Sequence, residues 1–529
     1  MRKLCEILLP MLLCLAPLAA SAQSFRVQCP TSTITHPTAG NNNSEPAYTG
    51  PTTLAAGPKG FLAPSANVNG AIKCQQISGG DGYATMGDGT QTYMFSFGPL
   101  SGLGDIANGQ PGTEYPSIFN TVYPGATPLQ PGDPATTGSS FTYNGAVGLA
   151  YDVDANLGSG TTGAPIDGHV DPRPIMDVGV MNGNIPAPMM AIDEDDEFFL
   201  TLTNVGMIMR PDLFEQHTVH FHGYPNASAY YDGVPDASVA INIGASFTYY
   251  YLAPDAGTYF WHCHITPPEH LQMGMVGQLY VRPRQNRVTG NLYAGLQQQQ
   301  LDLRTKCDSS DILCSNPLPV VNTGATGGGK YAYNDGDGST AYDVEYPMQI
   351  HGFDPNFHFV GMTFNPEGFA DMKDKYFLLN GRSYPDTVTT GPLQTQSADG
   401  VNHFSQPLPA IINIPAGKKA LLRISDLDVS EYQTLASLGI PMQVIGYNAK
   451  LLRDQAGNNM YYNTNSITLG GGESLDVILD ASDAGCGSTG CAAALYPAGS
   501  VFYLYTPNLD HLSNDAENFG GLMTEVRIN

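Results

Sequence analysis

Side chains that bind transition metals gather in two short segments of this chain, about forty residues apart. The donors of the first segment are His217, His220 and His222, and those of the second are His262, Cys263, His264, His270 and Met275. Two imidazoles, one thiolate and a weak thioether are the donors of a mononuclear blue-copper site. His217, Cys263, His270 and Met275 supply that set, with Met273 as the alternative thioether. The fold of this chain must therefore bring the two segments together.

The other four histidines form two His-x-His pairs. In a strand, residues i and i+2 point to the same face, so each pair aims two imidazoles in one direction. Cys263 lies between His262 and His264 and points to the opposite face. A second copper site on the histidine face, wired to Cys263 through two peptide links, is one interpretation. The other is that the four histidines are remnants, or ligands of a single mononuclear copper.

The composition predicts an all-β chain. Charged residues make up 13% of it, and it contains 60 glycines and 40 prolines, which suits many short strands joined by turns. Short β-branched and apolar runs recur at the spacing of a Greek-key sandwich. Before residue 300 they are expected from 71 to 97 and at 199–203, 239–243, 246–252, 257–261 and 276–281. Later strands are expected at 376–380, 410–414, 419–424, 442–445, 475–479, 501–505 and 523–528.

These runs divide the chain into two sandwich domains. The predicted parts are a signal peptide at 1–22, an irregular arm at 23–70, a copper-binding domain at 71–283 with a Gly/Pro-rich insertion at about 98–182, an interdomain region at 284–373, and a second domain at 374–529. The signal has a basic start, an apolar core too short to span a bilayer and a small-residue cleavage site. We therefore expect an exported protein, periplasmic or extracellular, without a membrane span.

Charge and cysteine usage agree with that location. A formal net charge of −26 repels phosphate backbones and anionic membranes, which excludes nucleic acid as a partner. In an oxidising compartment, disulfides are expected between Cys307 and Cys314, between Cys486 and Cys491, and between Cys29 and Cys74. This pairing leaves Cys263 as a free thiol.

The motifs resemble the multicopper oxidase family, whose domains are cupredoxin-like sandwiches. His220-Phe-His222-Gly, Tyr231-Asp-Gly-Val-Pro235 and Gly257-Thr-Tyr-Phe-Trp-His262 are similar to a first domain of that family, and residues 379–387 and 520–528 are similar to the start and end of another domain. The chain departs from the family in two ways. Six residues separate Cys263 from His270, where four are usual, and the second domain has lost its ligands. When the two domains are aligned, Gln433, Ala436 and Leu438 stand where His217, His220 and His222 stand.

The resemblance implies an enzyme that passes single electrons from a small-molecule or metal-ion donor through a type 1 copper at Cys263 to dioxygen. A full type 2/type 3 copper cluster in that family uses eight histidines, and this chain offers four, so our hypothesis is that a second copy completes the cluster in a homo-oligomer. Asp232 stands where the family has an acid that passes protons, although a turn-forming role before Gly233 fits equally well. The alternatives are an electron-transfer or copper-binding protein without oxidase activity, and a copper nitrite reductase.

Overall fold

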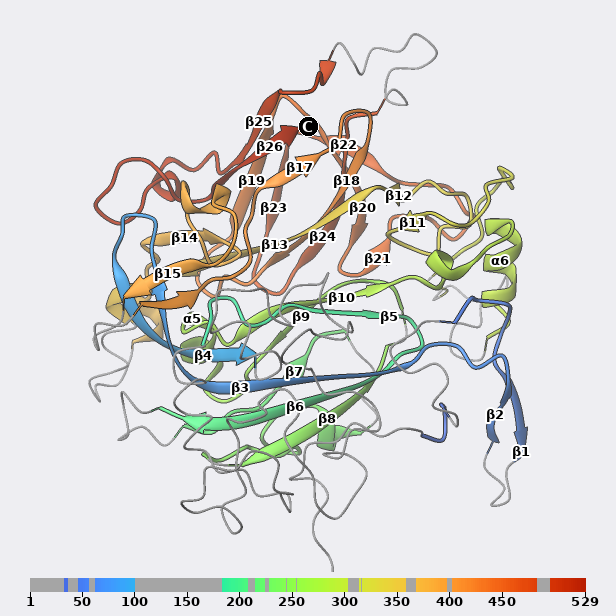
Figure 1. Ribbon diagram of the computed structural model, residues 1–529, viewed down its shortest axis with the longest axis horizontal. Helices are drawn as coiled ribbons and strands as arrows, with labels where there is room; N and C mark the ends of the chain where they lie inside the picture. Colours follow the sequence, from blue (N-terminus) through green and yellow to red (C-terminus); the bar gives the residue numbers. More distant parts are fainter. Residues whose placement is uncertain are drawn as a thin grey trace, which may run out of the picture.

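The computed structural model describes residues 33–36, 46–56, 62–99, 183–207, 215–223, 228–243, 245–253, 255–302, 314, 316–357, 368–396, 402–482 and 495–529. The described residues are mainly β-strands arranged in two stacked sandwiches, which confirms the all-β prediction (Figure 1). The predicted signal peptide, most of the insertion and at least one cysteine of every predicted disulfide lie outside these residues. Those three predictions therefore remain untested.

The first sandwich, blue and green in Figure 1, consists of two four-stranded sheets. One sheet has the order β4 (Gln91–Pro99), β3 (Ile72–Thr85), β6 (Glu197–Gly206) and β8 (Ser246–Leu252). The other has the order β5 (Met190–Asp193), β10 (Val276–Arg282), β9 (Gly257–His262) and β7 (His220–Phe221). Between them lies a continuous apolar core that includes Trp261, Cys263, Met273 and Met275. The predicted ligands Cys263 and Met275 are therefore part of a packed core and do not lie on a surface loop.

The second sandwich, orange and red in Figure 1, pairs a seven-stranded sheet with a five-stranded one. The larger sheet contains β14 (Tyr376–Leu379), β13 (Val344–Phe353), β18 (Lys419–Asp426), β24 (Ser474–Asp480), β20 (Met442–Tyr447), β21 (Lys450–Leu451) and β22 (Tyr462–Thr464). The smaller sheet contains β17 (Ile412–Ile414), β26 (Met523–Ile528), β25 (Val501–Tyr505), β19 (Gln433–Leu438) and β23 (Ser466–Leu469). A separate apolar core fills the space between these two sheets.

Two stretches differ from the sequence-based expectation. Residues 239–243 do not form a strand, because only Ile241 makes an isolated bridge, with His217. The interdomain region contains β13, which is part of the larger second sheet, and also α6 (Leu292–Gln299) and the short pair β11 (Lys330–Tyr331) and β12 (Ala341–Tyr342). Two further hairpins, β1 (Thr53–Ala56) with β2 (Leu62–Ala66) and β15 (Leu393–Gln396) with β16 (Asn402–Ser405), complete the sheets.

Buried polar contacts join the sandwiches where β9 and β10 meet β13, β18 and β24. Thr258 Oγ1 donates a hydrogen bond to Asp476 Oδ1 at 2.7 Å, and Ser474 Oγ donates to the Thr258 carbonyl at 2.7 Å. The guanidinium carbon of the buried Arg423 lies 4.5 Å from the ring centroid of Tyr280. Buried groups that are hydrogen-bonded in this way tolerate little displacement. The sheet that carries the histidines is thus held against the second sandwich.

The two sandwiches also come close together at Gly381, and replacing this residue by alanine tests that contact. Gly381 has φ +79°, and a Cβ there would lie 1.6 Å from the carbonyl oxygen of Ile185, whereas Gly417 has φ +77° and open space around its Cβ position. Each alanine should cost about 1 kcal/mol of the free energy of unfolding through left-handed strain. Gly381→Ala should cost about 2 kcal/mol more, because the two sandwiches must shift apart. Denaturant unfolding of both variants measures the difference, and equal losses would contradict the close contact.

Candidate metal centre

The hairpin between β9 and β10 places the cysteine. Cys263 follows the last residue of β9, and its backbone N–H donates to the Met275 carbonyl at 3.0 Å, which extends the β9–β10 pairing by one step. Its thiol is free and fully buried. The cysteine side chain therefore points into the apolar core, while its neighbours in the chain point the other way.

The six residues between Cys263 and His270 lead into a short helix, α5 (Pro267–Gln272), which starts at two prolines. The helix returns His270 to the cysteine, so the longer spacing does not separate the two side chains. Gln272 at the end of α5 is bonded to the second sandwich, because its Nε2 donates to Asp374 Oδ1 at 2.7 Å and its Oε1 accepts from the Asp354 N–H at 2.9 Å. The helix that carries His270 is thus attached to the first sandwich through the chain and to the second sandwich through the hydrogen bonds of Gln272.

Three of the four predicted blue-copper ligands come together around the sulfur. Cys263 Sγ lies 3.3 Å from His270 Nδ1 and 3.9 Å from His217 Nδ1, and the three donor atoms lie within 4.8 Å of one another. A metal bound to a sulfur at about 2.3 Å and to a nitrogen at about 2.0 Å in a trigonal plane sets the two about 3.8 Å apart. The side chain of Met275 is buried in the same core. The geometry and the soft donor set fit a copper ion.

Negative charge near the group formed by Cys263, His217 and His270 favours the binding of a cation. Glu215 Oε2 lies 3.4 Å from His270 Nε2. Burial alone would lower the pKa of His270, but the negative charge at Cys263, the hydrogen bond to its sulfur and the Glu215 carboxylate raise it to about 10. Burial and the positive charge of His270 lower the pKa of His217 well below its usual value. A metal ion would replace the positive charge that His270 otherwise carries.

The four remaining histidines meet on the other side of the hairpin. Ring centroids of His220 lie 5.1 Å from those of His222 and His264 and 5.4 Å from that of His262. His222 Nε2 and His262 Nε2 are 3.0 Å apart, the separation of two nitrogens that share one ion at about 2.0 Å. One donor nitrogen from each of His220, His222 and His262 lies within 4.8 Å of the other two. Both His-x-His pairs therefore converge as the strand alternation predicts.

Backbone carbonyls select the tautomer of two of these rings. Nδ1 of His262 bonds to the Cys263 carbonyl at 2.7 Å, and Nδ1 of His220 bonds to the Asp232 carbonyl at 2.7 Å. A carbonyl only accepts, so each Nδ1 carries the hydrogen and each Nε2 keeps its lone pair for a metal. Burial lowers the pKa of His262 to about 3, and partial burial of the His222 ring with the charges of His220 and His264 lowers the pKa of His222 to about 4. The rings of His222 and His262 are therefore uncharged at neutral pH.

Two short paths connect the sulfur to this cluster. One is the peptide from Cys263 to His262, shortened by the hydrogen bond between His262 Nδ1 and the Cys263 carbonyl. The other runs through Thr218, whose backbone N–H donates to Cys263 Sγ at 3.4 Å and whose Oγ1 accepts from the His264 N–H at 3.0 Å. The roles of Thr218 and Glu215 could not be predicted from the sequence, because neither residue is of a type that belongs to a blue-copper ligand motif.

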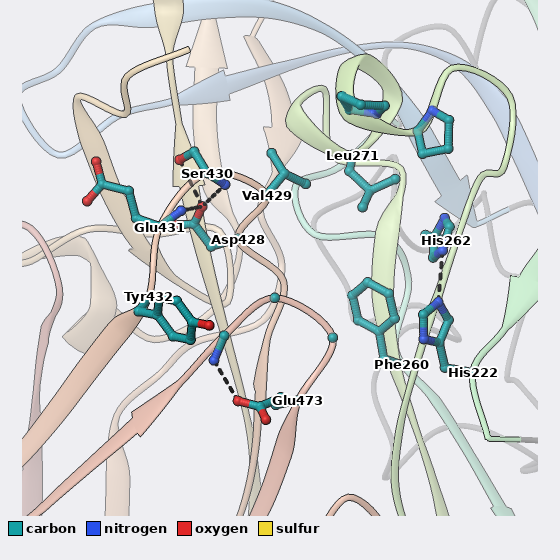
Figure 2. A pocket seen from close by; sticks show the side chains of 15 residues that line it. His222, Phe260, His262, Leu271, Asp428, Val429, Ser430, Glu431, Tyr432 and Glu473 are labelled. Atoms are coloured by element: carbon teal, nitrogen blue, oxygen red, sulfur yellow. Dashed lines mark hydrogen bonds between the residues drawn. The ribbon is translucent and has the colours of Figure 1, made fainter. Parts of the chain in front are cut away.

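A cleft of about 660 Å³ opens beside the cluster, between the two sandwiches. Figure 2 shows His222 and His262 with Phe260 and Leu271 on one wall, and Asp428, Ser430, Glu431, Tyr432 and Glu473 on the other. The first wall belongs to the first sandwich and the second wall to the second sandwich. A small molecule that enters the cleft reaches two of the histidines.

Comparison with known proteins agrees with this site. Residues 167–286 match the family model described as multicopper oxidase, and this segment contains all eight predicted metal ligands. This segment is a multicopper oxidase domain. The fold predicted from the resemblance, two cupredoxin-like sandwiches, is confirmed.

Relatives of the multicopper oxidase domain include a laccase of Aspergillus fumigatus, 34% identical over 109 residues, which are 20% of this chain and 17% of the laccase. A multicopper oxidase of Mycobacterium tuberculosis is 30% identical over 140 residues, 25% of this chain and 26% of that protein. A copper-containing nitrite reductase of Rhizobium meliloti is 32% identical over 114 residues, 21% of this chain and 27% of the reductase. The matches therefore span about a quarter or less of each relative. Among solved structures, the blue copper oxidase of Nitrosomonas europaea aligns over 86% of both chains with 17% identity and a TM-score of 0.47.

The second sandwich differs from the multicopper oxidase domain at the corresponding position. Gln433 stands there in place of a histidine, and its Oε1 lies 2.9 Å from His511 Nδ1. His511 Nε2 lies 2.9 Å from Glu431 Oε2, and its ring stacks on Phe377 at 3.8 Å. Both imidazole nitrogens are thus used in hydrogen bonds. Within the described residues, the second sandwich holds no converging group of three His, Cys, Asp or Glu donors.

The low pKa values of His222 and His262 predict acid-resistant metal binding by these two residues. Protons compete for an imidazole nitrogen only below its pKa, so Cu(II) affinity at His222 and His262 should stay constant from pH 7 to about pH 5 and fall below about pH 4. Competition titration of the Cys263→Ser variant measures this affinity without the thiolate site, and the urea-unfolded variant is the control. A decline that starts near pH 6.5, as for exposed imidazoles, would contradict the burial seen here.

Proposed function

We propose that this protein is an exported copper-dependent oxidoreductase that passes single electrons from a reducing substrate through Cys263 to the histidine cluster, where dioxygen is reduced. The observation that carries the proposal is the connection of two converging donor groups through one residue. Copper, when bound, supplies the one-electron couple. The chain supplies buried ligand residues on the Cys263 side of the β9–β10 hairpin and an open cleft on the side of the histidine cluster.

Electron entry is proposed beside His270. Its ring is buried, and the Glu215 carboxylate next to its Nε2 is partly exposed, with 27% of its side chain accessible. A net charge of −26 favours the approach of cations. These features support a metal ion or a neutral small molecule, such as a phenol, as the electron donor. Met275 is proposed as the weak axial ligand.

A second copy of the chain is proposed to complete the copper cluster. His222 is exposed, and His220 and His264 are half-buried, so another molecule can approach this side of the cluster. Of the residues that line the cleft from the second sandwich, none is a histidine. A homo-oligomer in which another chain brings further imidazoles to this face would supply them.

Asp232 is proposed to orient the His220 ring and to pass protons to the molecule that is reduced at this face. Its carbonyl holds His220 Nδ1, and its Oδ2 lies 3.7 Å from the same nitrogen. Its backbone also ends the short 3-10 helix η4 (Ala229–Tyr231), as expected of a turn residue. These contacts support the proposal that the turn-forming and the proton-passing interpretation of Asp232 apply together.

Nitrite reduction is the second candidate. The three-imidazole group and the similarity to nitrite reductases favour it. It uses the same electron path and differs in the molecule that enters the cleft. An electron carrier without a catalytic site is the third outcome, and nitrite-dependent and dioxygen-dependent turnover separate all three.

Export is proposed from residues 1–22. We also propose the predicted division into two domains, with the second domain extended toward the N-terminus to include β13, which the sequence analysis had assigned to the interdomain region. Searched across its described residues, the chain contains no helix with the length and apolar character needed to cross a membrane.

Replacing Cys263 by serine tests the electron path. The variant should lose the visible copper–thiolate absorption, and dioxygen uptake should fall by more than about 100-fold, because loss of an outer partner alone costs 10- to 100-fold. Met190→Leu, a volume-conserving change in the same buried core, is the control and should keep both properties. Unchanged colour and turnover in the serine variant would contradict the assignment.

Copper content and assembled mass test the shared cluster. The wild-type protein should be an oligomer with more than one copper per chain, and His222→Ala should lose the additional copper while it keeps the thiolate absorption. Elemental analysis combined with light scattering measures both quantities. A monomer with one copper per chain and no dioxygen uptake would leave an electron carrier as the function.

A further inference from the structure

The wall of the cleft opposite the histidines contains carboxyl groups with unusual surroundings. Asp428 and Ser430 face the cleft from the loop after β18 (Figure 2). The side chain of Asp428 is almost fully buried behind the surface of the cleft, with 3% exposure. A buried carboxyl beside a reaction chamber can exchange protons only with its immediate partners.

Asp374 is the immediate neighbour of Asp428. A Cβ built on Gly352 would lie 2.1 Å from Asp374 Oδ2 and 2.5 Å from Asp428 Oδ2, so the two carboxyls lie side by side over the backbone of β13. Ser430 Oγ donates to Asp374 Oδ2 and lies 3.1 Å from Asp428 Oδ1. Gly352 therefore leaves the space in which the pair meets, and Ser430 bridges it.

The strand below the pair contributes a buried imidazole. His351 is fully buried, and the backbone of Gln272 and Leu427 lies beside its ring. It interacts electrostatically with Asp428. His351 therefore belongs to the polar surroundings of the carboxyl pair.

The charged and titratable groups around the pair come from several elements. They are His351 of β13, Asp426 of β18, Glu431 of the following loop, Glu473 of the loop before β24, and His511, which reaches Asp428 through Gln433. Among the described residues, no lysine or arginine forms an ion pair with Asp374 or Asp428. Burial first, and then the negative charge of Asp428, raise the pKa of Asp374 to about 8. Two carboxyls without a cation retain one proton at neutral pH.

We propose that Asp374 and Asp428 share one proton and deliver it, through Asp428 and Ser430, to the molecule that is reduced at the histidine wall of the cleft. This inference rests on the proposed function. Reduction of one dioxygen to two waters consumes four electrons and four protons. The electrons come from the reducing substrate by way of Cys263, and the protons come from solvent, which reloads the pair after each transfer. The pair lies on the second sandwich, which gives the copper-free half of the chain a part in the reaction.

The experiment uses the full-length, copper-loaded protein and three variants, Asp374→Asn, Asp428→Asn and Glu473→Gln. Glu473 lines the same cleft and accepts from the Gly470 N–H at 2.8 Å, so its variant removes one cleft carboxylate without touching the pair. Both asparagine variants should keep the copper content and the thiolate absorption, and their dioxygen uptake should fall by about 100-fold or more. The Glu473→Gln variant should stay within about twofold of the wild type.

The pH profile separates a proton donor from a structural role. Asp374 holds its proton below about pH 8, so wild-type uptake should decline as the pH rises past that value, and the asparagine variants should lose this step. Unchanged rates and profiles in both asparagine variants would overturn the inference, as would an equal loss in Glu473→Gln. If an asparagine variant does not fold, two measurements on the wild type test the inference: the decline of dioxygen uptake at high pH and a slower rate in deuterated water. The absence of both effects would overturn the inference. A copper-loaded wild type that takes up no dioxygen would instead overturn the proposed function.

Discussion

The hydrogen bond from the Cys263 N–H to the Met275 carbonyl sets the geometry on which both metal groups depend. By extending the β9–β10 pairing past the end of β9, it keeps the alternation of side chains through the residues from His262 to His264. The thiol then points into the core, and the imidazoles of His262 and His264 point to the opposite face, where His262 lines the cleft. A shift of one residue in this pairing would exchange the two faces and destroy both groups at once.

The second sandwich shows how such a site disappears without loss of the fold. Gln433 and His511 form a hydrogen-bonded pair, and Glu431 uses the second imidazole nitrogen. Stacking on Phe377 fills the remaining space with ordinary core contacts. The polar groups that a metal would have satisfied are satisfied by neighbouring side chains instead, and this is the condition for keeping them buried.

Much of the architecture is visible in the sequence, because half-buried strands leave an alternating pattern. The runs predicted at 246–252, 501–505 and 523–528 coincide with β8, β25 and β26. β13 is missed because Pro347, Gln349 and His351 interrupt its apolar pattern, although all but its first three residues are buried. The convergence of the two His-x-His pairs follows from strand geometry alone. The carboxyl pair of Asp374 and Asp428 does not, because residues 54 positions apart meet only through the packing of β13 and the loop after β18.

The tie between Gln272 and the second sandwich has a consequence for electron transfer. An ion that changes valence prefers different bond lengths in its two oxidation states. A rigid protein scaffold limits the rearrangement of the ligands and so keeps the free energy needed for each electron transfer small. Here the helix that carries His270 is held through Asp374 and Asp354 by the second sandwich, whose described residues supply no donor to either metal-binding group. The second sandwich thus stiffens the group around Cys263, and its removal would make that group less rigid even with every ligand residue intact.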